Sequence, residues 1–315
     1  MTVSNHLQEL AGLPAFDFPD AEAEPKAKLP DAGSVAWRVG VDAYDSEEEW
    51  EEAFARFLAA VDSTQVRALI VGAWSEAYDS PPDDLTAAVI AASDRLPSLR
   101  ALFIGDITFE ECEISWINQT AMGPLINSLP QLHSFGVRGG QELNMAGIKH
   151  DGLRSLTVET GGLDAGVVRD IGTADLPALE HLDIWLGVSW YGANTIVADL
   201  DPFLTGARLP ALKSLALRNS EIQDDIAAAL AGAPVVARLE TLDLSMGTLG
   251  DEGAEALLGG QPLTHLKKLD LHHHYLSEPM EKRLRETLEP AGVVVDLSER
   301  ESARDDESRY TAVAE

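Results

Sequence analysis

The chain has 315 residues, of which 45% are hydrophobic, so it can bury a substantial core. Its 53 acidic and 23 basic side chains give a formal net charge of −30, which repels phosphate backbones and anionic lipid headgroups and excludes nucleic acid and membrane surfaces as partners. One cysteine, no apolar run of about 18 residues and no secretory leader together predict a cytoplasmic protein without internal disulfides.

The first 34 residues show no regular pattern. They contain a short apolar cluster, followed by an aperiodic charged stretch; the cluster comprises Leu7, Leu10, Leu13, Phe16 and Phe18. Because the first unit of a repeat protein leaves an open edge, we expect residues 1–34 to form a cap over that edge.

The regular pattern begins with a strand and a helix. Residues 35–41 alternate in hydrophobicity as a strand does, and Ser46 with Glu49 has the spacing of a capping box that starts a helix. Trp50, Phe54 and Phe57 then fall on one helical face. This stretch therefore predicts the first β-α unit.

The same unit recurs along the chain as L-x-x-L-x-L followed by an amphipathic stretch. The first apolar residues of the motif are Val66, Leu99, Leu132, Leu153, Leu179, Leu212, Leu239 and Leu266, with Val293 as a terminal copy. The intervals between them are 33, 33, 21, 26, 33, 27, 27 and 27 residues. A 27-residue unit holds a strand and a short helix, whereas the 21-residue unit is too short, so we expect no full helix between Leu132 and Leu153.

Helices are expected after most of these strands. Their predicted starts are Pro82, Ala121, Asp164, Asn194, Glu221, Asp251 and Ser277. Short strands joined by helices run parallel, and right-handed crossovers place all the helices on one side. The pattern is that of a leucine-rich repeat and predicts an α/β solenoid, a horseshoe with a parallel sheet on the concave face and helices on the convex face. It would span residues 35–297, followed by a disordered acidic tail over residues 298–315.

Two resemblances support this assignment. From Leu239 onward the units resemble the ribonuclease-inhibitor-like class of leucine-rich repeats, whose helix often reads D-E-G-A-x-x-L, as residues 251–257 do. The whole chain resembles an uncharacterised family of stand-alone bacterial leucine-rich-repeat proteins, through residues 6–18, 110–119, 158–163, 186–192 and 269–279. That resemblance implies a binding accessory to a peptide- or metabolite-modifying system and assigns no catalytic residue.

The residues between the strand leucines should line the concave face in columns. The first column reads Ile70, Phe103, Gly136, Thr157, Asp183, Ala216, Asp243 and Asp270, and the next contains Arg138, Glu159, Trp185, Arg218 and His272. On adjacent strands, Arg138 could pair with Glu159, and Trp185 could make a cation–π contact with Arg218. Arg and Trp dominate binding hot spots, so these columns are the predicted binding surface, although each residue alone could be a solvated polar filler.

Two further features are open to more than one interpretation. Asp243, Asp270 and His272 could bind a divalent cation or form a metal-dependent active site, but Asp is a common filling of this repeat and no third ligand has a fixed spacing, so we predict no metal. Long loops after three strands carry Trp74 with Tyr78, Trp116, and Trp190 with Tyr191. These aromatic residues either cover the core or, at Trp116, Trp190 and Tyr191, form a rim that grips a cationic or peptide ligand.

Signatures of catalysis are absent from the sequence. Cys112 lies among glutamates, which disfavour a reactive thiolate, and no P-loop, dinucleotide fingerprint or nucleophile elbow occurs. We therefore expect a non-catalytic module without cofactors that binds a protein or peptide with a basic surface. A purely structural subunit, the remaining alternative, would show an apolar patch on its helices.

Overall fold

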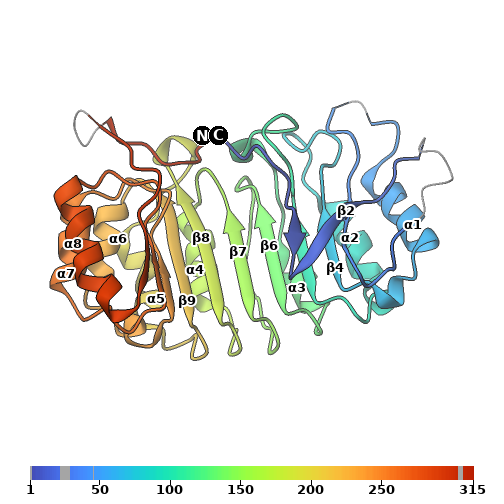
Figure 1. Cartoon of the computed structure of the whole chain (residues 1–315). Helices are drawn as coiled ribbons and strands as arrows, with labels where there is room; N and C mark the ends of the chain where they lie inside the picture. Colours follow the sequence, from blue (N-terminus) through green and yellow to red (C-terminus); the bar gives the residue numbers. More distant parts are fainter. Residues whose placement is uncertain (1, 22–28, 45, 304–307) are drawn as a thin grey trace. The chain divides into compact units, whose positions relative to one another are not determined.

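The computed structural model describes residues 2–21, 29–44, 46–303 and 308–315 (Figure 1). It divides into two compact units, an N-terminal unit of residues 2–157 with 174–176 and a C-terminal unit of residues 158–173 with 177–314. From Ala36 onward strands and helices alternate along the chain, except between residues 138 and 155, as the repeat pattern predicts. In the part of the chain that is described, no helix is both long and apolar enough to cross a membrane.

In the N-terminal unit, strands that follow one another in the chain are also neighbours in the sheet. The strands are β1 (Glu9–Leu10), β2 (Leu13–Asp17), β3 (Ala36–Val39), β4 (Ala68–Val71), β5 (Ala101–Ile104) and β6 (Ser134–Arg138). All pairs are parallel except the hairpin of β1 and β2. The helices are α1 (Trp50–Ala60), α2 (Asp83–Ala91) and α3 (Met122–Asn127), with 3-10 turns η1 (Ser63–Gln65), η2 (Ser93–Arg95) and η3 (Ile114–Trp116).

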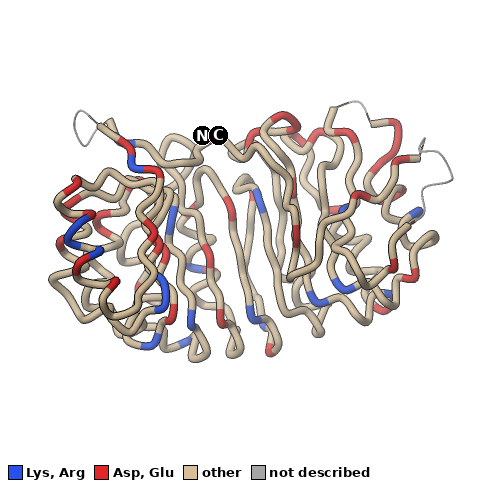
Figure 2. The backbone as a smooth tube through the Cα atoms, in the orientation of Figure 1, with Lys and Arg blue, Asp and Glu red and all other residues tan. Residues whose placement is uncertain are grey.

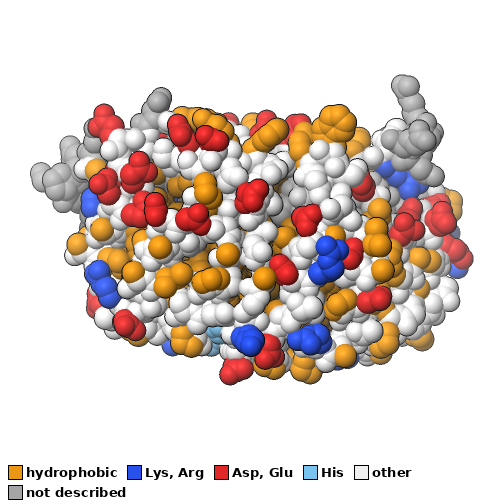
Figure 3. Space-filling model, turned by 180° about the vertical axis from the view of Figure 1, so that it is seen from behind, with side chains coloured by type: hydrophobic (Ala, Val, Ile, Leu, Met, Phe, Trp, Pro, Cys, Tyr) orange, Lys and Arg blue, Asp and Glu red, His pale blue; other side chains and the backbone are white. Residues whose placement is uncertain are grey.

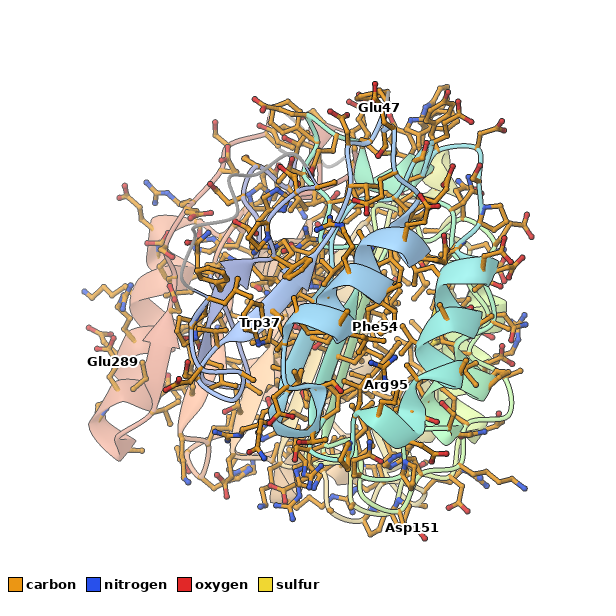
Figure 4. All side chains as sticks on the ribbon, turned by 90° about the vertical axis from the view of Figure 1, so that its right-hand side faces the viewer. Trp37, Glu47, Phe54, Arg95, Asp151 and Glu289 are labelled. Carbon is orange, nitrogen blue, oxygen red and sulfur yellow. The ribbon has the colours of Figure 1, made fainter. Side chains whose placement is uncertain are left out.

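The helix side of this unit holds an aromatic core. Trp37 of β3 lies 5.5 Å from Phe57 of α1, centroid to centroid, and 5.4 Å from Phe16 of β2. Phe54 stacks on Trp50 within α1, and Figure 4 shows Trp37 and Phe54 from this end of the protein. The burial of these rings accounts for the apolar residues that alternate in β3 and then recur at helical spacing in α1.

The C-terminal unit repeats the arrangement. Its strands are β8 (His181–Gly187), β9 (Ser214–Ser220), β10 (Thr241–Asp243), β11 (Lys268–Asp270) and β12 (Val294–Asp296), while β7 (Ser155–Glu159) crosses the unit boundary. Its helices are α4 (Ala165–Thr173), α5 (Asp201–Thr205), α6 (Gln223–Leu230), α7 (Asp251–Gly259) and α8 (Glu278–Leu288), with η4 (Ser189–Tyr191), η5 (Val197–Leu200), η6 (Pro234–Arg238) and η7 (Glu289–Ala291). Parallel pairing places Leu215, Leu242, Leu269 and Val295 in one line, as the repeat predicts.

The predicted helix starts agree with the structure to within two residues at six of seven positions. The exception is Asn194, where the chain first forms η5 and α5 begins only at Asp201. The run Thr195-Ile196-Val197 is β-branched, which disfavours a helix there, and Pro202 suits the first turn of the later one. The predicted lack of a full helix between Leu132 and Leu153 is confirmed.

The first helix is capped differently from the prediction. Glu49, not Ser46, is the N-cap of α1, and it forms a capping box with Glu52. The Ser46 hydroxyl instead donates to the carbonyl of Glu48 at 2.6 Å. The predicted box was wrong because Ser46 would start the helix three residues early, before the last turn of the loop is complete.

The N-terminal segment does more than extend the sheet. Ala11 and Gly12, with φ of 52° and 75°, form a tight turn that folds β1 back antiparallel to β2. As a result, the side chains of this segment pack onto the sheet face opposite the helices: Leu7, Leu10, Leu13 and Ala15 contact a cluster of Ala36, Ala68, Ile70 and Ala101.

The end of the chain also differs from the prediction of a disordered tail over residues 298–315. Residues 304–307 lie outside the described residues, but Thr311, Ala312 and Val313 are buried in the C-terminal unit. The charged composition of residues 298–309 conceals this short apolar segment, which is too brief to show a period of its own.

Candidate functional site

The candidate site is the sheet face opposite the helices, here called the column face. Within each unit the predicted columns are in register: Ile70, Phe103 and Gly136 align in the N-terminal unit. In the C-terminal unit Asp183, Ala216, Asp243 and Asp270 align, and so do Trp185 and Arg218. Side chains in one column are thus neighbours at the strand spacing of about 4.8 Å.

In the N-terminal unit the column face is covered. Ile70 is fully buried because the N-terminal segment packs over it, and Phe103 is 3% exposed, with the Arg138 guanidinium over its ring. The predicted binding columns are therefore not exposed at these strands, and the correction follows from the hairpin at Ala11 and Gly12, which turns the apolar residues of the segment toward the sheet.

Arg138 belongs to a buried polar cluster, here called the Asp106 cluster, of His6, Arg38, Asp106 and Arg138. The Asp106 carboxylate is fully buried and accepts from Arg38 Nε at 2.7 Å and from Arg138 at 3.2 Å. The backbone N–H of Leu7 donates to both its oxygens, at 3.0 and 3.1 Å. Arg138, 3% exposed, also lies over the Phe103 ring, so it is not the exposed hot-spot residue that the sequence predicted.

The electrostatics of the Asp106 cluster favour its charged form. Burial opposes ionisation of Asp106, but the hydrogen bond from His6 and the charges of Arg138 and Arg38 outweigh it and hold the pKa of the carboxyl below its usual range. The hydrogen bond to Asp106 likewise raises the pKa of His6. This cluster therefore fastens the N-terminal segment to β3, β5 and β6. The predicted Arg138–Glu159 pair stays a prediction, because those residues belong to different units.

In the C-terminal unit, Arg218 is the centre of the column face. Its guanidinium binds both oxygens of Asp183, at 2.9 and 2.6 Å, and lies 5.1 Å from the centroid of the Trp185 ring, which confirms the predicted cation–π contact. Burial works against the charge of Arg218, but the carboxylates of Asp183 and Asp243 outweigh it and raise its pKa. Trp185 is 8% exposed, so its ring packs against Arg218 and presents little surface to a partner.

The aspartates of this face have a structural role that the sequence did not reveal. Asp243, Asp270 and Asp296 each accept a hydrogen bond from the backbone N–H two residues further on, at 2.9, 3.1 and 3.1 Å. A side chain that satisfies the N–H at the strand end explains why the L-D-L filling recurs. Burial raises the pKa of Asp243, and Arg218, 3.8 Å away, offsets this only in part.

An aspartate that the sequence did not single out, Asp296, lies beside Asp270 and His272. Asp270, His272 and Asp296 have ligand atoms within 4.8 Å of one another, while Asp243 is not in this group. The signal for Asp296 was its place in the terminal repeat copy at Val293, which aligns it with Asp270. Carboxylates and imidazole suit a divalent cation, but the ammonium of Lys268 already lies 2.7 Å from Asp270 Oδ2.

His272 makes the stability of this face dependent on pH. Its Nδ1 lies 2.8 Å from Asp270 Oδ1, and that hydrogen bond raises the pKa of His272 in the folded protein. The pair therefore stabilises the fold fully below the ordinary histidine pKa of about 6.5 and loses its effect as pH rises through the folded value. We therefore expect wild type to be more stable than His272→Asn at low pH. The difference in free energy of unfolding between the two proteins should be about 0.5–1 kcal/mol larger at about pH 5.5 than at about pH 9. Urea denaturation at both pH values checks this, and a difference that is constant with pH would contradict it.

The aromatic residues of the long loops fall into two groups. Trp74 is 5% exposed and its indole N–H donates to the Ser80 carbonyl at 2.9 Å, so it covers the core. Trp116 on η3 is 55% exposed and Trp190 on η4 is 87% exposed, with Tyr191 half-buried beside it. Trp116 lies in the N-terminal unit and Trp190 in the C-terminal unit, so a shared rim stays a prediction.

Alanine at both Trp190 and Tyr191 is expected to change the free energy of unfolding by less than about 1 kcal/mol, because Trp190 gains little from burial. Trp74→Ala should cost about 3–5 kcal/mol. Thermal denaturation of the two variants compares them directly. A loss in the double variant as large as that in Trp74→Ala would instead assign Trp190 and Tyr191 to the core.

Cys112 is predicted not to be a nucleophile. Burial, with the nearby charge of Glu113, raises the pKa of the Cys112 thiol to about 11, which disfavours a nucleophile there.

Among the described residues, the large hydrophobic side chains that are exposed lie in loops, 3-10 turns, β12 and the chain end, and none lies in an α-helix. Figure 3 shows hydrophobic side chains interrupted by charged ones on the rear face. In the part of the chain that is described, the exposed large hydrophobic side chains therefore form no patch on the α-helices.

The fold and the column face define a class, a repeat protein in which parallel strands alternate with helices. The chain is similar over 84% of its length to a protein of known crystal structure from Bacteroides fragilis, at 29% identity and a TM-score of 0.77, covering 73% of that chain. An internalin from Listeria monocytogenes aligns at 13% identity, over 76% of each chain, with a TM-score of 0.32, and supports no inference. No family model and no curated protein matches the chain.

Proposed function

We propose that the protein is a leucine-rich-repeat solenoid that acts as a non-catalytic cytoplasmic binding module, and that its ligand is a protein or peptide with a basic surface. The binding surface is the column face of the C-terminal unit, together with Trp190 and Tyr191 on the loop after β8. The N-terminal unit contributes stability, because its column face is covered by its own first residues.

One observation carries this proposal: carboxylates of four strands share the column face of the C-terminal unit. Among the described residues, Arg218 pairs with Asp183 and Asp243, and Lys268 and His272 pair with Asp270. Asp296 lies in register beside Asp270. Burial raises the pKa of Asp243 because it disfavours the ionised carboxylate. A further cation placed beside Asp243 would stabilise that carboxylate and would be bound by it. A lysine or arginine side chain of a partner supplies such a cation.

The charge of the whole chain favours the same partner. Figure 2 shows acidic residues spread through both units, in keeping with the formal net charge of −30. A basic partner would be steered toward this surface and held less tightly as salt screens the charges. The binding accessory of a peptide- or metabolite-modifying system is one setting in which such a module would act.

The experiment compares capture of proteins from the native cell by immobilised wild type and by Asp243→Asn/Asp270→Asn. Asparagine keeps the oxygen that accepts from the strand-end N–H and removes the charge. We expect the double variant to retain about tenfold less of a basic partner at about 50 mM salt, and wild type to release that partner at about 300 mM salt.

The matched control is Asp151→Asn/Glu289→Gln, which makes the same change in net charge at two exposed positions outside the strands, both labelled in Figure 4. The control should capture as wild type does. Equal capture by all three proteins would contradict the proposed surface, and equal loss in both variants would assign binding to net charge alone.

A divalent-cation site, as part of a metal-binding protein or a metal-dependent enzyme, is the second candidate function. It is favoured by the mutual approach of Asp270, His272 and Asp296 and disfavoured by the Lys268 ammonium on Asp270. Calorimetric titration with Mn²⁺ and Zn²⁺ separates the candidates. Heat of binding at tens of micromolar that is lost in Asp296→Asn would support the metal site, and its absence in wild type would remove it.

A further inference from the structure

The end of the chain is bound as an extended peptide at the C-terminal ends of β9 to β11. Thr311, Ala312 and Val313 are 2%, 5% and 6% exposed, and in Figure 1 this part of the chain, in dark red, crosses the strand ends of the C-terminal unit. The contacts are made by residues far away in the sequence. This region, formed by Asn219, Asp224, Met246, His273 and Tyr275, is here called the tail groove.

Three successive repeats present one backbone-binding group each. The side-chain amide of Asn219 donates to the Val313 carbonyl at 2.7 Å and accepts from its N–H at 3.0 Å. The Met246 carbonyl accepts from the Ala312 N–H at 2.7 Å, and His273 Nε2 lies 3.1 Å from the Tyr310 carbonyl.

The three groups owe their direction to an unusual backbone. Asn219, Met246 and His273 have φ of 54°, 66° and 52°, so the chain bends in the same way at the same point of each repeat. Asn219 is fully buried, yet its amide is used on the peptide as a paired donor and acceptor. Hydrogen bonds to the peptide main chain also hold extended peptides at exposed strand edges, where the strand backbone supplies them.

The groove also contacts two side chains of the bound segment, Arg309 and Tyr310. The Arg309 guanidinium lies 3.1 Å from Asp224 Oδ2 and over the Tyr275 ring at 5.7 Å. Tyr310 meets Tyr275 edge to face, with ring centroids 6.2 Å apart, and its backbone N–H donates to the Tyr275 hydroxyl at 3.0 Å. Beside Arg309 is a cavity of about 540 Å³ lined in part by Glu221, Asp224, Asp225 and Glu252.

We propose that the tail groove is a peptide-binding site, that residues 308–314 are its resident ligand, and that an extended peptide of the same chemistry in a partner protein displaces them. That chemistry is a basic residue followed by an aromatic one and then by small apolar residues. The segment is suited to displacement because it is held by hydrogen bonds and a few small side chains, while Tyr310 is 54% exposed. The site adjoins the column face at Met246, whose sulfur lies 3.3 Å from the Arg218 guanidinium, but it does not rest on the function proposed for that face.

The test uses the full chain and a fluorescent peptide with the sequence of residues 308–315. A tail variant, Arg309→Ala/Val313→Asp, removes contacts of the resident segment and leaves every groove residue in place. By fluorescence anisotropy the peptide should bind the tail variant at least about tenfold more tightly than wild type, whose own segment competes at a high effective concentration. A peptide with the reversed sequence should not bind.

A matched pair of charge changes in the tail variant locates the site. Asp224→Asn keeps the oxygen that accepts from Gly250 and Gly253 but loses the charge that faces Arg309, so peptide affinity should fall about fivefold. Glu255→Gln, on the exposed side of α7, should leave the affinity unchanged. Equal effects of the two changes would contradict the proposed site.

Hydrogen exchange of wild type tests the proposal without a variant. The amides of Ala312 and Val313 should exchange at least about 100-fold faster than that of Leu217 in β9, because the segment opens without global unfolding. The proposal is overturned if those amides exchange only with global unfolding, if the tail variant loses its fold, or if the folded tail variant binds the peptide no more tightly than wild type.

Discussion

Replacing Asp106 by asparagine is expected to lower the free energy of unfolding by about 3–5 kcal/mol. The carboxylate is fully buried between Arg38 and Arg138, so the change leaves two guanidinium groups without their shared counter-charge. It also weakens the bonds from the Leu7 N–H that hold the N-terminal segment on the column face. Urea denaturation followed by circular dichroism measures the loss.

The control for this prediction is Asp17→Asn. Asp17 also pairs with Arg38, but its side chain is 77% exposed, so its removal should cost less than about 1 kcal/mol. Together the two variants separate a buried charge from an exposed one on the same arginine. Similar small losses in both would mean that Arg38 and Arg138 are solvated well enough to do without Asp106.

The second large effect is expected for Leu269→Asp in β11. Leu269 is fully buried and lies in register with Leu242 and Val295, so a carboxylate there would be enclosed by apolar neighbours on both sides. We expect a loss of at least about 4 kcal/mol and a broadened unfolding transition, because each repeat is stabilised mainly by its neighbours. Calorimetry of the full chain measures both quantities.

Val294→Asp provides the comparison within the same sheet. Val294 is also a strand residue, in β12, but it is 62% exposed, and the same substitution should change the free energy of unfolding by less than about 0.5 kcal/mol. If Leu269→Asp were tolerated as well as Val294→Asp, the leucine line would not be the core of the C-terminal unit.

The tertiary structure changes which surface is available for binding. The sequence predicts one set of columns along the whole repeat array, and the register of those columns is confirmed within each unit. The structure covers the columns of the N-terminal unit and leaves those of the C-terminal unit with Arg218, Asp243 and His272 partly accessible. A search for partners should therefore begin with the C-terminal unit.

The sequence by itself determined what depends on periodicity. The line of Leu242 and Leu269, the positions of six helices, the missing helix of the shortest repeat and the Trp185–Arg218 contact all follow from spacing within or between adjacent repeats. These features are readable because each repeat meets its neighbour at a fixed offset, so a local pattern determines a spatial contact.

Only the tertiary structure decided the contacts that have no period. Leu7 reaches Asp106 across 99 residues, and Asn219 reaches Val313 across 94, and neither segment repeats anything in the sequence it binds. Single hydrogen bonds to buried groups determine where such segments lie, and the spacing of residues in the sequence does not predict these bonds. For that reason the burial of Arg138 and the tail groove appear only in the folded protein, where both ends of the chain lie against the repeats between them.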